Sequence, residues 1–118
     1  MEIKEQAIAI AKALDEKKAG DVKVIRVEEI TTLAEYFVIA SASSNTQIKA
    51  LSESCEKAMD EIGEPVHHIE GHRGGTWVLM DFSAVVVHIF MEEAREFYDL
   101  ERLWKDGEEI DLSEILLP

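Results

Sequence analysis

The sequence predicts a single α/β domain whose five-stranded mixed sheet is flanked by helices. The chain has 118 residues, a common size for one domain. Apolar residues recur at helical spacing in two long segments, and short runs rich in valine and isoleucine lie between and after them. The resulting order is helix, two strands, helix, three strands, helix. This order is typical of a mixed sheet covered by helices.

The N-terminal segment reads as a helix followed by a strand. Four apolar residues recur every three or four positions and form one face of a helix over about residues 2–18. These residues are Ile3, Ala7, Ile10 and Leu14. Residues 22–27 are rich in β-branched side chains, which favours a strand.

A buried strand and a capped helix come next. Residues 36–40 are apolar at every position, as expected for a strand that is buried on both faces. Ser44 and Gln47 have the three-residue spacing of a capping box, so a second helix is expected to begin there. Cys55 falls in the apolar stripe of this helix, where we interpret it as a small core residue. Gly63 is expected to end the helix.

The second half of the chain is predicted to contain three strands and a helix. The strands are expected over residues 66–70, 76–82 and 84–90. Because only a tight turn near Ser83 separates the last two, they should form an antiparallel hairpin. The third of them is the most hydrophobic and is expected at the centre of the sheet. A helix begins at Met91, and a short turn or helix covers residues 100–104. We take residues 1–105 as the domain and residues 106–118 as an acidic C-terminal tail.

Acidic residues dominate the charge of the chain. Twenty-five Asp and Glu oppose twelve Lys and Arg, which gives a formal net charge of −13. Because nucleic acids and anionic membranes are bound through cations, we expect neither direct nucleic-acid readout nor membrane binding. A basic protein surface suits this charge, but acidity that only aids solubility explains the charge slightly better. The short apolar runs, the lack of a leader and the single cysteine predict a cytoplasmic protein.

The histidines of the chain favour structural roles. His68, Glu70 and His72 could share one side of an extended segment, but zinc needs three or four converging ligands. We therefore expect no metal site. His88 interrupts an apolar strand on the parity opposite to Val85, and no nucleophile lies beside it in the sequence. We interpret His88 as a hydrogen-bonded structural residue rather than a catalytic one.

The serine-rich turn at residues 41–45 leaves an enzymatic alternative open. A turn between a strand and a helix start is a place where enzymes hold phosphate. The helix that follows carries no acid before Glu53, however, and the Gly-Lys-Ser/Thr ending of a P-loop is missing. A plain connection is favoured, with a minimal nucleotidyltransferase as the alternative. We expect no cofactor and no catalytic residue.

An aromatic and acidic set in the second half of the chain indicates a partner surface. Trp77 and Asp81 lie four positions apart and therefore on one face of the predicted fourth strand. The segment EFYDLERLW adds Tyr98, Glu101 and Trp104. Aromatic rings are frequent interface anchors, and carboxylates beside them can pair with cations of a partner. Packing in the core explains the same residues equally well.

Three segments, TTLAEYFVIASASSNTQIKA, GTWVLMDFSAVVVHIF and REFYDLERLW, resemble the ribosomal silencing factor family, also called RsfS or Iojap-like. The resemblance runs from about residue 5 to 105. It implies a nucleotidyltransferase-like topology (α-β-β-α-β-β-β-α) without the catalytic carboxylates, and a regulator that is not an enzyme. Family members bind the large ribosomal subunit through a basic protein, the fourteenth of that subunit, on the face that meets the small subunit. They thereby block subunit joining and repress translation when nutrients are scarce.

The resemblance also assigns roles to residues of this chain. The five residues that it implies at the partner surface are Trp77, Asp81, Tyr98, Glu101 and Trp104. Trp77 is expected as the apolar anchor and Asp81 as the acceptor for a lysine or arginine, while the other three form or brace the surface. His88 and Leu100 also match the family and are expected to be structural. A homodimer that uses the apolar strand or the tail stays open.

Overall fold

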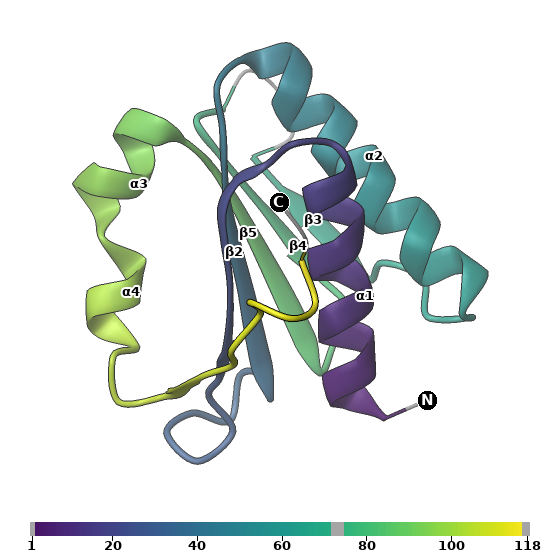
Figure 1. The fold of residues 1–118 in the computed structure, drawn as a ribbon, viewed down its shortest axis with the longest axis vertical. Helices are drawn as coiled ribbons and strands as arrows, with labels where there is room; N and C mark the ends of the chain where they lie inside the picture. Colours follow the sequence, from purple (N-terminus) through teal and green to yellow (C-terminus); the bar gives the residue numbers. More distant parts are fainter. Residues whose placement is uncertain (1, 72–74, 117–118) are drawn as a thin grey trace.

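The computed structural model describes residues 2–71 and 75–116 and shows a sheet between two unequal layers of helices (Figure 1). The helices are α1 (Ile3–Glu16), α2 (Asn45–Glu61), α3 (Glu92–Tyr98) and α4 (Leu100–Leu103). The long helices α1 and α2 cover one face, and the short α3 and α4 lie against the other. Among the described residues, no helix is long and apolar enough to cross a membrane.

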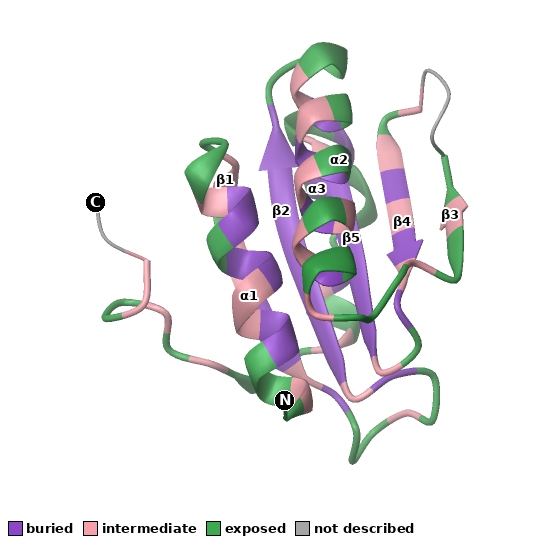
Figure 2. Ribbon diagram, turned by 90° about the vertical axis from the view of Figure 1, so that its right-hand side faces the viewer, coloured by how far each residue is buried: buried purple, intermediate pink, exposed green. Residues whose placement is uncertain are grey.

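The sheet is mixed and has its most hydrophobic strands at the centre. Its strands are β1 (Gly20–Arg26), β2 (Tyr36–Ala42), β3 (His68–Glu70), β4 (Trp77–Asp81), β5 (Val85–Met91) and β6 (Glu108–Glu109). They lie in the order β3-β4-β5-β2-β1-β6, with β2 and β5 parallel and every other pair antiparallel. β2 is buried along its whole length, as Figure 2 shows. The structure thus confirms the predicted α/β order, the doubly buried strand and the β4–β5 hairpin.

The predicted count of five strands is wrong, because the C-terminal tail adds a sixth. In β6, Glu108 lies opposite Arg26 of β1, and their side chains form an ion pair at 3.7 Å. The amide of Ile110 then donates to the carbonyl of Val24 at 2.8 Å. Ile110 and Leu112 pack against the core beneath α1. A strand of two residues is too short to show the alternation by which strands are recognised in a sequence.

The α2 start confirms the predicted cap at Ser44, but Gln47 does not close a capping box on the Ser44 amide. The Ser44 hydroxyl accepts from the Gln47 amide at 3.0 Å, which caps the helix. The Gln47 side chain reaches past Ser44 and accepts from the backbone N–H of Ser43 at 2.7 Å. Its Nε2 donates to the carbonyls of Lys17 and Lys18 at the end of α1. One glutamine therefore joins the start of α2 to the end of α1.

Two apolar clusters lie on opposite faces of the sheet. The larger is enclosed by α1 and α2, and Leu51, Cys55 and Met59 of α2 are fully buried in it. Burial raises the pKa of Cys55 to about 12, so the thiol stays protonated and serves as core, as predicted. The smaller cluster includes Phe37 and Phe90 and is covered by α3 and α4. The candidate site develops at the margin of this smaller cluster.

Candidate functional site

A buried arginine holds α3 and α4 against the sheet. Arg95 is 7% exposed. Its guanidinium donates two hydrogen bonds to the carboxylate of Glu101, from Nε to Oε1 at 3.1 Å and from Nη2 to Oε2 at 3.3 Å. Nη1 donates to the Ser41 hydroxyl at the end of β2 at 2.9 Å, and Nη2 lies 3.3 Å from a carboxylate oxygen of Asp21 on β1. A guanidinium can be buried when its charge and donors are met in this way. The two helices, which we call the α3–α4 arm, are thereby tied to β1 and β2.

Glu101 completes this clamp from inside the arm. Asp99 adopts a left-handed conformation (φ 46°) between α3 and α4, which lets the chain turn so that Glu101 meets Arg95. Lys23 of β1 adds an ion pair at 3.2 Å. Burial by itself would raise the pKa of Glu101, but the hydrogen bonds and charges of Arg95 and Lys23 outweigh it and lower that pKa below its usual value. The structure thus places Glu101 in an internal ion pair.

Aromatic rings form a continuous cluster between the arm and β4. The indole of Trp77 stacks on Phe90 with ring centroids 5.0 Å apart, and the ring of Tyr98 of α3 is tilted against the same indole, also with centroids 5.0 Å apart. Trp104 packs on a different part of the cluster, edge-to-face with Phe37 at 5.0 Å. Trp77 and Trp104 are half-buried, whereas 46% of Tyr98 is exposed. The cluster is therefore anchored in the core and reaches the surface at its edge.

His88 lies at the centre of this cluster. Its ring is edge-to-face with Phe37 at 5.0 Å, and its Nδ1 accepts a hydrogen bond from the Trp77 indole N–H at 3.2 Å. Because an indole nitrogen only donates, Nδ1 carries no proton, and the proton of the neutral ring is on Nε2. Nε2 is buried and has no hydrogen-bond partner among the described residues. Burial lowers the pKa of His88 to about 4, which keeps the ring neutral near pH 7.

The arm leaves the β3–β4 end of the sheet uncovered. Trp77, Leu79 and Asp81 are half-buried and share one face of β4, while Val78 and Met80 point into the larger core. The predicted parity of Trp77 and Asp81 is confirmed. Residues directly opposite one another in paired strands project from the same side of a sheet. His68 and Glu70 of β3 lie opposite Asp81 and Leu79 and thus extend this surface.

We call this surface the open face and define it by its five sheet residues and the tyrosine beside it. The open face consists of His68, Glu70, Trp77, Leu79, Asp81 and Tyr98. It joins two apolar side chains and an aromatic phenol to carboxylates. Asp81 uses Oδ1 to accept from the Ser83 amide at 2.7 Å, which holds the β4–β5 turn. Among the described residues Asp81 forms no ion pair.

The structure therefore divides the five residues that were predicted at the partner surface. It brings Trp77, Asp81 and Tyr98 to the open face, whereas Glu101 pairs with Arg95 inside the arm and Trp104 packs on Phe37. His88 and Leu100, which were predicted to be structural, are both buried. Sequence reasoning missed Arg95, because an arginine in a short polar helix reads as solvent-exposed. It also missed Phe97, which is 81% exposed and edge-to-face with Tyr98.

The serine-rich turn and the histidine set are less suited to binding than the open face. In the turn at residues 41–45, Ser41 is bound by Arg95, and the Ser43 amide and hydroxyl both donate to Gln47, which leaves fewer donors for a phosphate. His68 lies 3.0 Å from Glu70 at the surface. His72, the third member of the weighed metal set, lies outside the described residues. Within the described ranges, no three His, Cys, Asp or Glu side chains gather as metal ligands.

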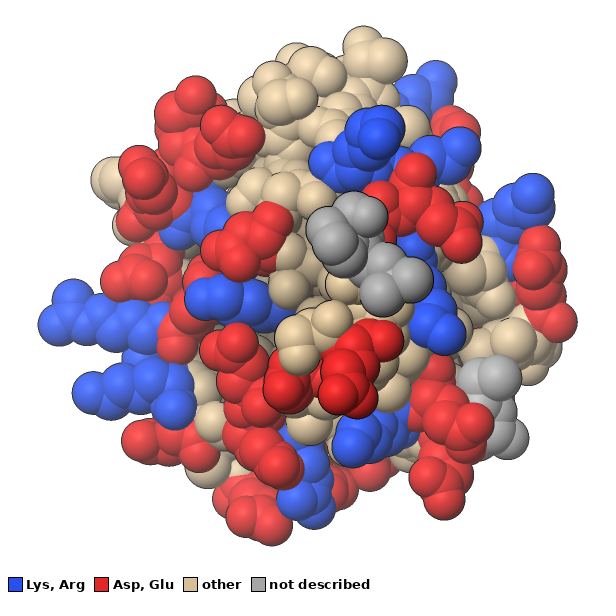
Figure 3. Space-filling model, viewed as in Figure 1, with Lys and Arg blue, Asp and Glu red and all other residues tan. Residues whose placement is uncertain are grey.

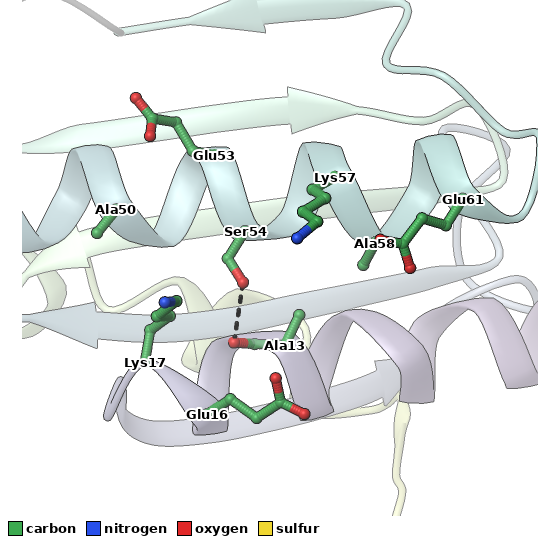
Figure 4. A pocket seen from close by; sticks show the side chains of 9 residues that line it. All are labelled: Ala13, Glu16, Lys17, Ala50, Glu53, Ser54, Lys57, Ala58 and Glu61. Atoms are coloured by element: carbon green, nitrogen blue, oxygen red, sulfur yellow. Dashed lines mark hydrogen bonds between the residues drawn. The ribbon is translucent and has the colours of Figure 1, made fainter.

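A groove of about 410 Å³ lies between α1 and α2, on the other side of the sheet from the open face (Figure 4). Its floor consists of small side chains, including Ala13, Ala50 and Ala58, and Ser54 donates across it to the Ala13 carbonyl at 3.2 Å. Its rim carries both lysines and glutamates, so charges of both signs line it. Binding pockets usually offer aromatic or larger apolar walls. The open face offers such groups, and this groove does not.

Carboxylates are spread over the face that Figure 3 shows, with lysines and arginines between them. Among the described residues, three of the twelve lysines and arginines form ion pairs: Arg26 with Glu28, Glu29 and Glu108, and Arg95 and Lys23 with Glu101. The net charge of −13 is thus expressed as a broad negative field. A partner that approaches the open face meets aromatic rings on the same face as the carboxylates of Glu70 and Asp81.

The buried neutral His88 predicts a stability that depends on pH. The folded-state pKa of about 4 lies below the ordinary value near 6.5, so the unfolded chain takes up a proton that the folded chain refuses. The contribution of His88 to the free energy of unfolding is therefore largest above pH 6.5. It falls by up to about 3 kcal/mol as the pH drops to 4.

Denaturant unfolding of the native chain and of His88→Asn at several pH values measures this effect. Other groups titrate equally in both proteins, so the difference between the two curves isolates His88. We expect the native chain to lose more stability than His88→Asn between pH 6.5 and 4. Parallel curves would show that His88 is not a buried neutral ring.

Comparison with known proteins identifies the family. The family model described as "Ribosomal silencing factor during starvation" matches residues 1–117. A ribosomal silencing factor RsfS of Bacillus subtilis (strain 168) is 38% identical over 102 residues, which cover 86% of each protein. A Mus musculus relative named "Mitochondrial assembly of ribosomal large subunit protein 1" is 33% identical over 94 residues, or 77% of this chain and 41% of the mouse protein. A crystal structure of a Chromobacterium violaceum protein matches with a TM-score of 0.86 at 34% identity, over 96% of this chain and 93% of that one. The chain belongs to the ribosomal silencing factor family.

Proposed function

We propose that this protein docks through its open face on the large ribosomal subunit and sterically blocks the joining of the small subunit, which represses translation under nutrient limitation. The partner in this proposal is a basic protein of the large subunit, its fourteenth, on the face that meets the small subunit. The protein acts by occupying that face and not as an enzyme. Family membership supports a silencing role, and the name of the mouse relative refers to the large subunit.

The observation that carries the proposal is the partly exposed Trp77 on the same face of β4 as Asp81, on an uncovered part of the sheet. Sheet faces of this composition are normally covered, because the burial of aromatic surface lowers the free energy of the protein. The indole is held from behind by Phe90 and Tyr98, so its position is set before a partner arrives. A preorganised anchor loses little side-chain entropy on binding. These properties are typical of a binding hot spot.

Electrostatics favours a basic protein over rRNA as the direct partner. A chain with a net charge of −13 is repelled by phosphates, and this repulsion acts over roughly 10 Å at moderate salt. Asp81 and Glu70 provide acceptors at the open face for lysine or arginine side chains. In this proposal, long-range charge attraction guides the approach of the partner, and short-range aromatic contact then holds the complex together.

A subunit-joining experiment tests the function. Purified small and large subunits are mixed with magnesium, with and without the protein, and sedimented through a gradient. We expect the protein to lower the yield of joined ribosomes and to migrate with the large subunit. Joining at full yield with a saturating amount of the protein would reject the proposal.

Replacement of Trp77 by alanine tests the anchor. We expect Trp77→Ala to weaken binding to large subunits by about 2 kcal/mol or more, because the ring would supply the central apolar contact. Leu33→Ala is the matched control, since Leu33 is 70% exposed in the loop between β1 and β2 and is not one of the open-face residues. Isothermal titration or a sedimentation binding assay measures both. Equal affinities for a folded Trp77→Ala and the native chain would remove Trp77 from the site.

Replacement of Asp81 by asparagine tests the acidic contact. Asparagine keeps an oxygen that can accept from the Ser83 amide, so the turn is preserved while the charge is lost. The control, Glu53→Gln, removes one charge from the exposed side of α2. We expect Asp81→Asn to slow association with large subunits at low salt more than Glu53→Gln does, and this difference should shrink as salt is added. Stopped-flow kinetics would refute the contact if both variants behaved alike.

Exposed apolar side chains on the α3–α4 arm favour self-association as a second use of this region. Phe97 and Leu103 are 81% and 72% exposed. A homodimer formed through them would bury part of the same edge of the molecule as docking does. Light scattering of the free protein measures the dimer, and dissociation of that dimer by added large subunits would show that the two surfaces overlap.

A further inference from the structure

Trp77 would serve as an anchor only if its indole has one orientation, and stacking alone does not select it. The contacts with Phe90 and Tyr98 set the plane of the ring. Such apolar contacts are weakly directional, and the terminal torsion of a tryptophan side chain has broad, roughly two-fold minima. A ring turned over about this torsion would keep much of its stacking while its N–H and its six-membered ring exchanged sides.

One directional contact distinguishes the two orientations. The Trp77 indole N–H donates to Nδ1 of His88 at 3.2 Å. His88 lies opposite Leu79 in the register of β4 and β5, and Trp77 lies opposite Phe90, so His88 and Trp77 are diagonal neighbours on one face. In the turned orientation the indole N–H would leave the imidazole, and Nδ1 would become a buried acceptor without a donor. That loss makes the turned orientation less stable.

His88 is itself held firmly enough to direct another side chain. It is 5% exposed, and the rings of Phe37, Phe90 and Trp77 surround it with centroids 5.0, 6.3 and 5.8 Å away. Its own strand, β5, pairs with β2 on one side and β4 on the other. An acceptor fixed on a central strand is a better reference point than one on a loop.

We propose that His88 is a positioning residue for docking, which holds the indole of Trp77 through its unprotonated Nδ1 in the orientation that a partner meets. This inference rests on the proposed function. It does not place His88 in contact with the partner, because the imidazole is covered by its aromatic neighbours. It assigns the buried histidine a role at the surface that packing alone does not require.

Two substitutions separate this role from a packing role. His88→Leu fills the apolar site, cannot accept a hydrogen bond and removes the buried Nε2 that has no partner. It should therefore fold at least as stably as the native chain at neutral pH. His88→Asn places an amide oxygen near the position of Nδ1 and can accept from the indole. A packing role predicts that leucine is tolerated better than asparagine, and the positioning role predicts the reverse for binding.

Binding to purified large subunits is measured under conditions in which denaturation curves show each variant folded. We expect His88→Leu to bind about three- to tenfold more weakly than the native chain, the effect of one lost hydrogen bond. His88→Asn should stay within about twofold of the native affinity. In a Trp77→Phe background, which lacks the indole N–H, His88→Leu should have no further effect.

Nitrogen NMR provides a readout that needs no ribosome. In the native chain the Trp77 indole N–H, assigned with Trp104→Phe, should show a hydrogen-bonded shift and slow exchange with water. His88→Leu should return it towards the free value. Imidazole nitrogen shifts should report a proton on Nε2 and none on Nδ1.

The outcomes are distinguishable. If the native chain binds large subunits and His88→Leu binds equally well, or if His88→Asn is as weak as His88→Leu, the positioning role is overturned and the proposed function stands. If the native chain does not bind, the proposed function fails, and the positioning role fails with it. An indole signal that is the same in the native chain and His88→Leu would also overturn the inference, whatever the affinities.

Discussion

The clamp between Arg95 and Glu101 determines which part of the sheet stays open. Both faces of this sheet are apolar, and α1 and α2 are long enough to cover one of them. The other face is covered only by the short α3–α4 arm, and short helices have little stability of their own. Arg95 compensates by tying the arm to β1 and β2 through Ser41 and Asp21. The arm is thereby held over β2 and β5, and β3 and β4 remain uncovered.

The position of the arm also explains how an acidic protein can present an apolar surface without losing its core. Tyr98 follows Arg95 by three positions, about one helical turn, so the clamp that fixes the arginine also brings the phenol against Trp77. The indole is then packed from behind by Phe90 and from the side by Tyr98. What reaches solvent is the edge of a cluster whose inner members, Phe37, His88 and Phe90, are buried, which limits the exposed apolar area. The surrounding carboxylates oppose unspecific association of this edge.

Sequence reasoning recovered what depends on local period and missed what depends on distant contacts. The parity of Trp77 and Asp81 and the cap at Ser44 follow from short spacings, and the double burial of β2 follows from an unbroken apolar run; the structure confirms all three. Glu101 pairs with Arg95, six positions away in the sequence, and with Lys23, 78 positions away, so no local sequence pattern predicts this pairing. The tail strand β6 has only two residues, too few to show the alternation of side chains by which a strand is recognised. The family resemblance was recognised from three motif segments. Composition and the spacing of apolar residues could not have identified it, because they do not distinguish a docking face from a core.

The buried His88 shows that the fold and the open face make different demands on one position. For the fold alone an apolar residue at position 88 would serve better, because the imidazole leaves Nε2 without a partner among the described residues and such a buried donor costs about 1–3 kcal/mol. The same imidazole provides the only directional contact that the structure shows for the Trp77 ring within the described residues. The imidazole therefore lowers the stability of the core, and it orders the Trp77 side chain at the surface. A residue that weakens the interior while it orders an exposed aromatic ring is expected where that ring has a partner.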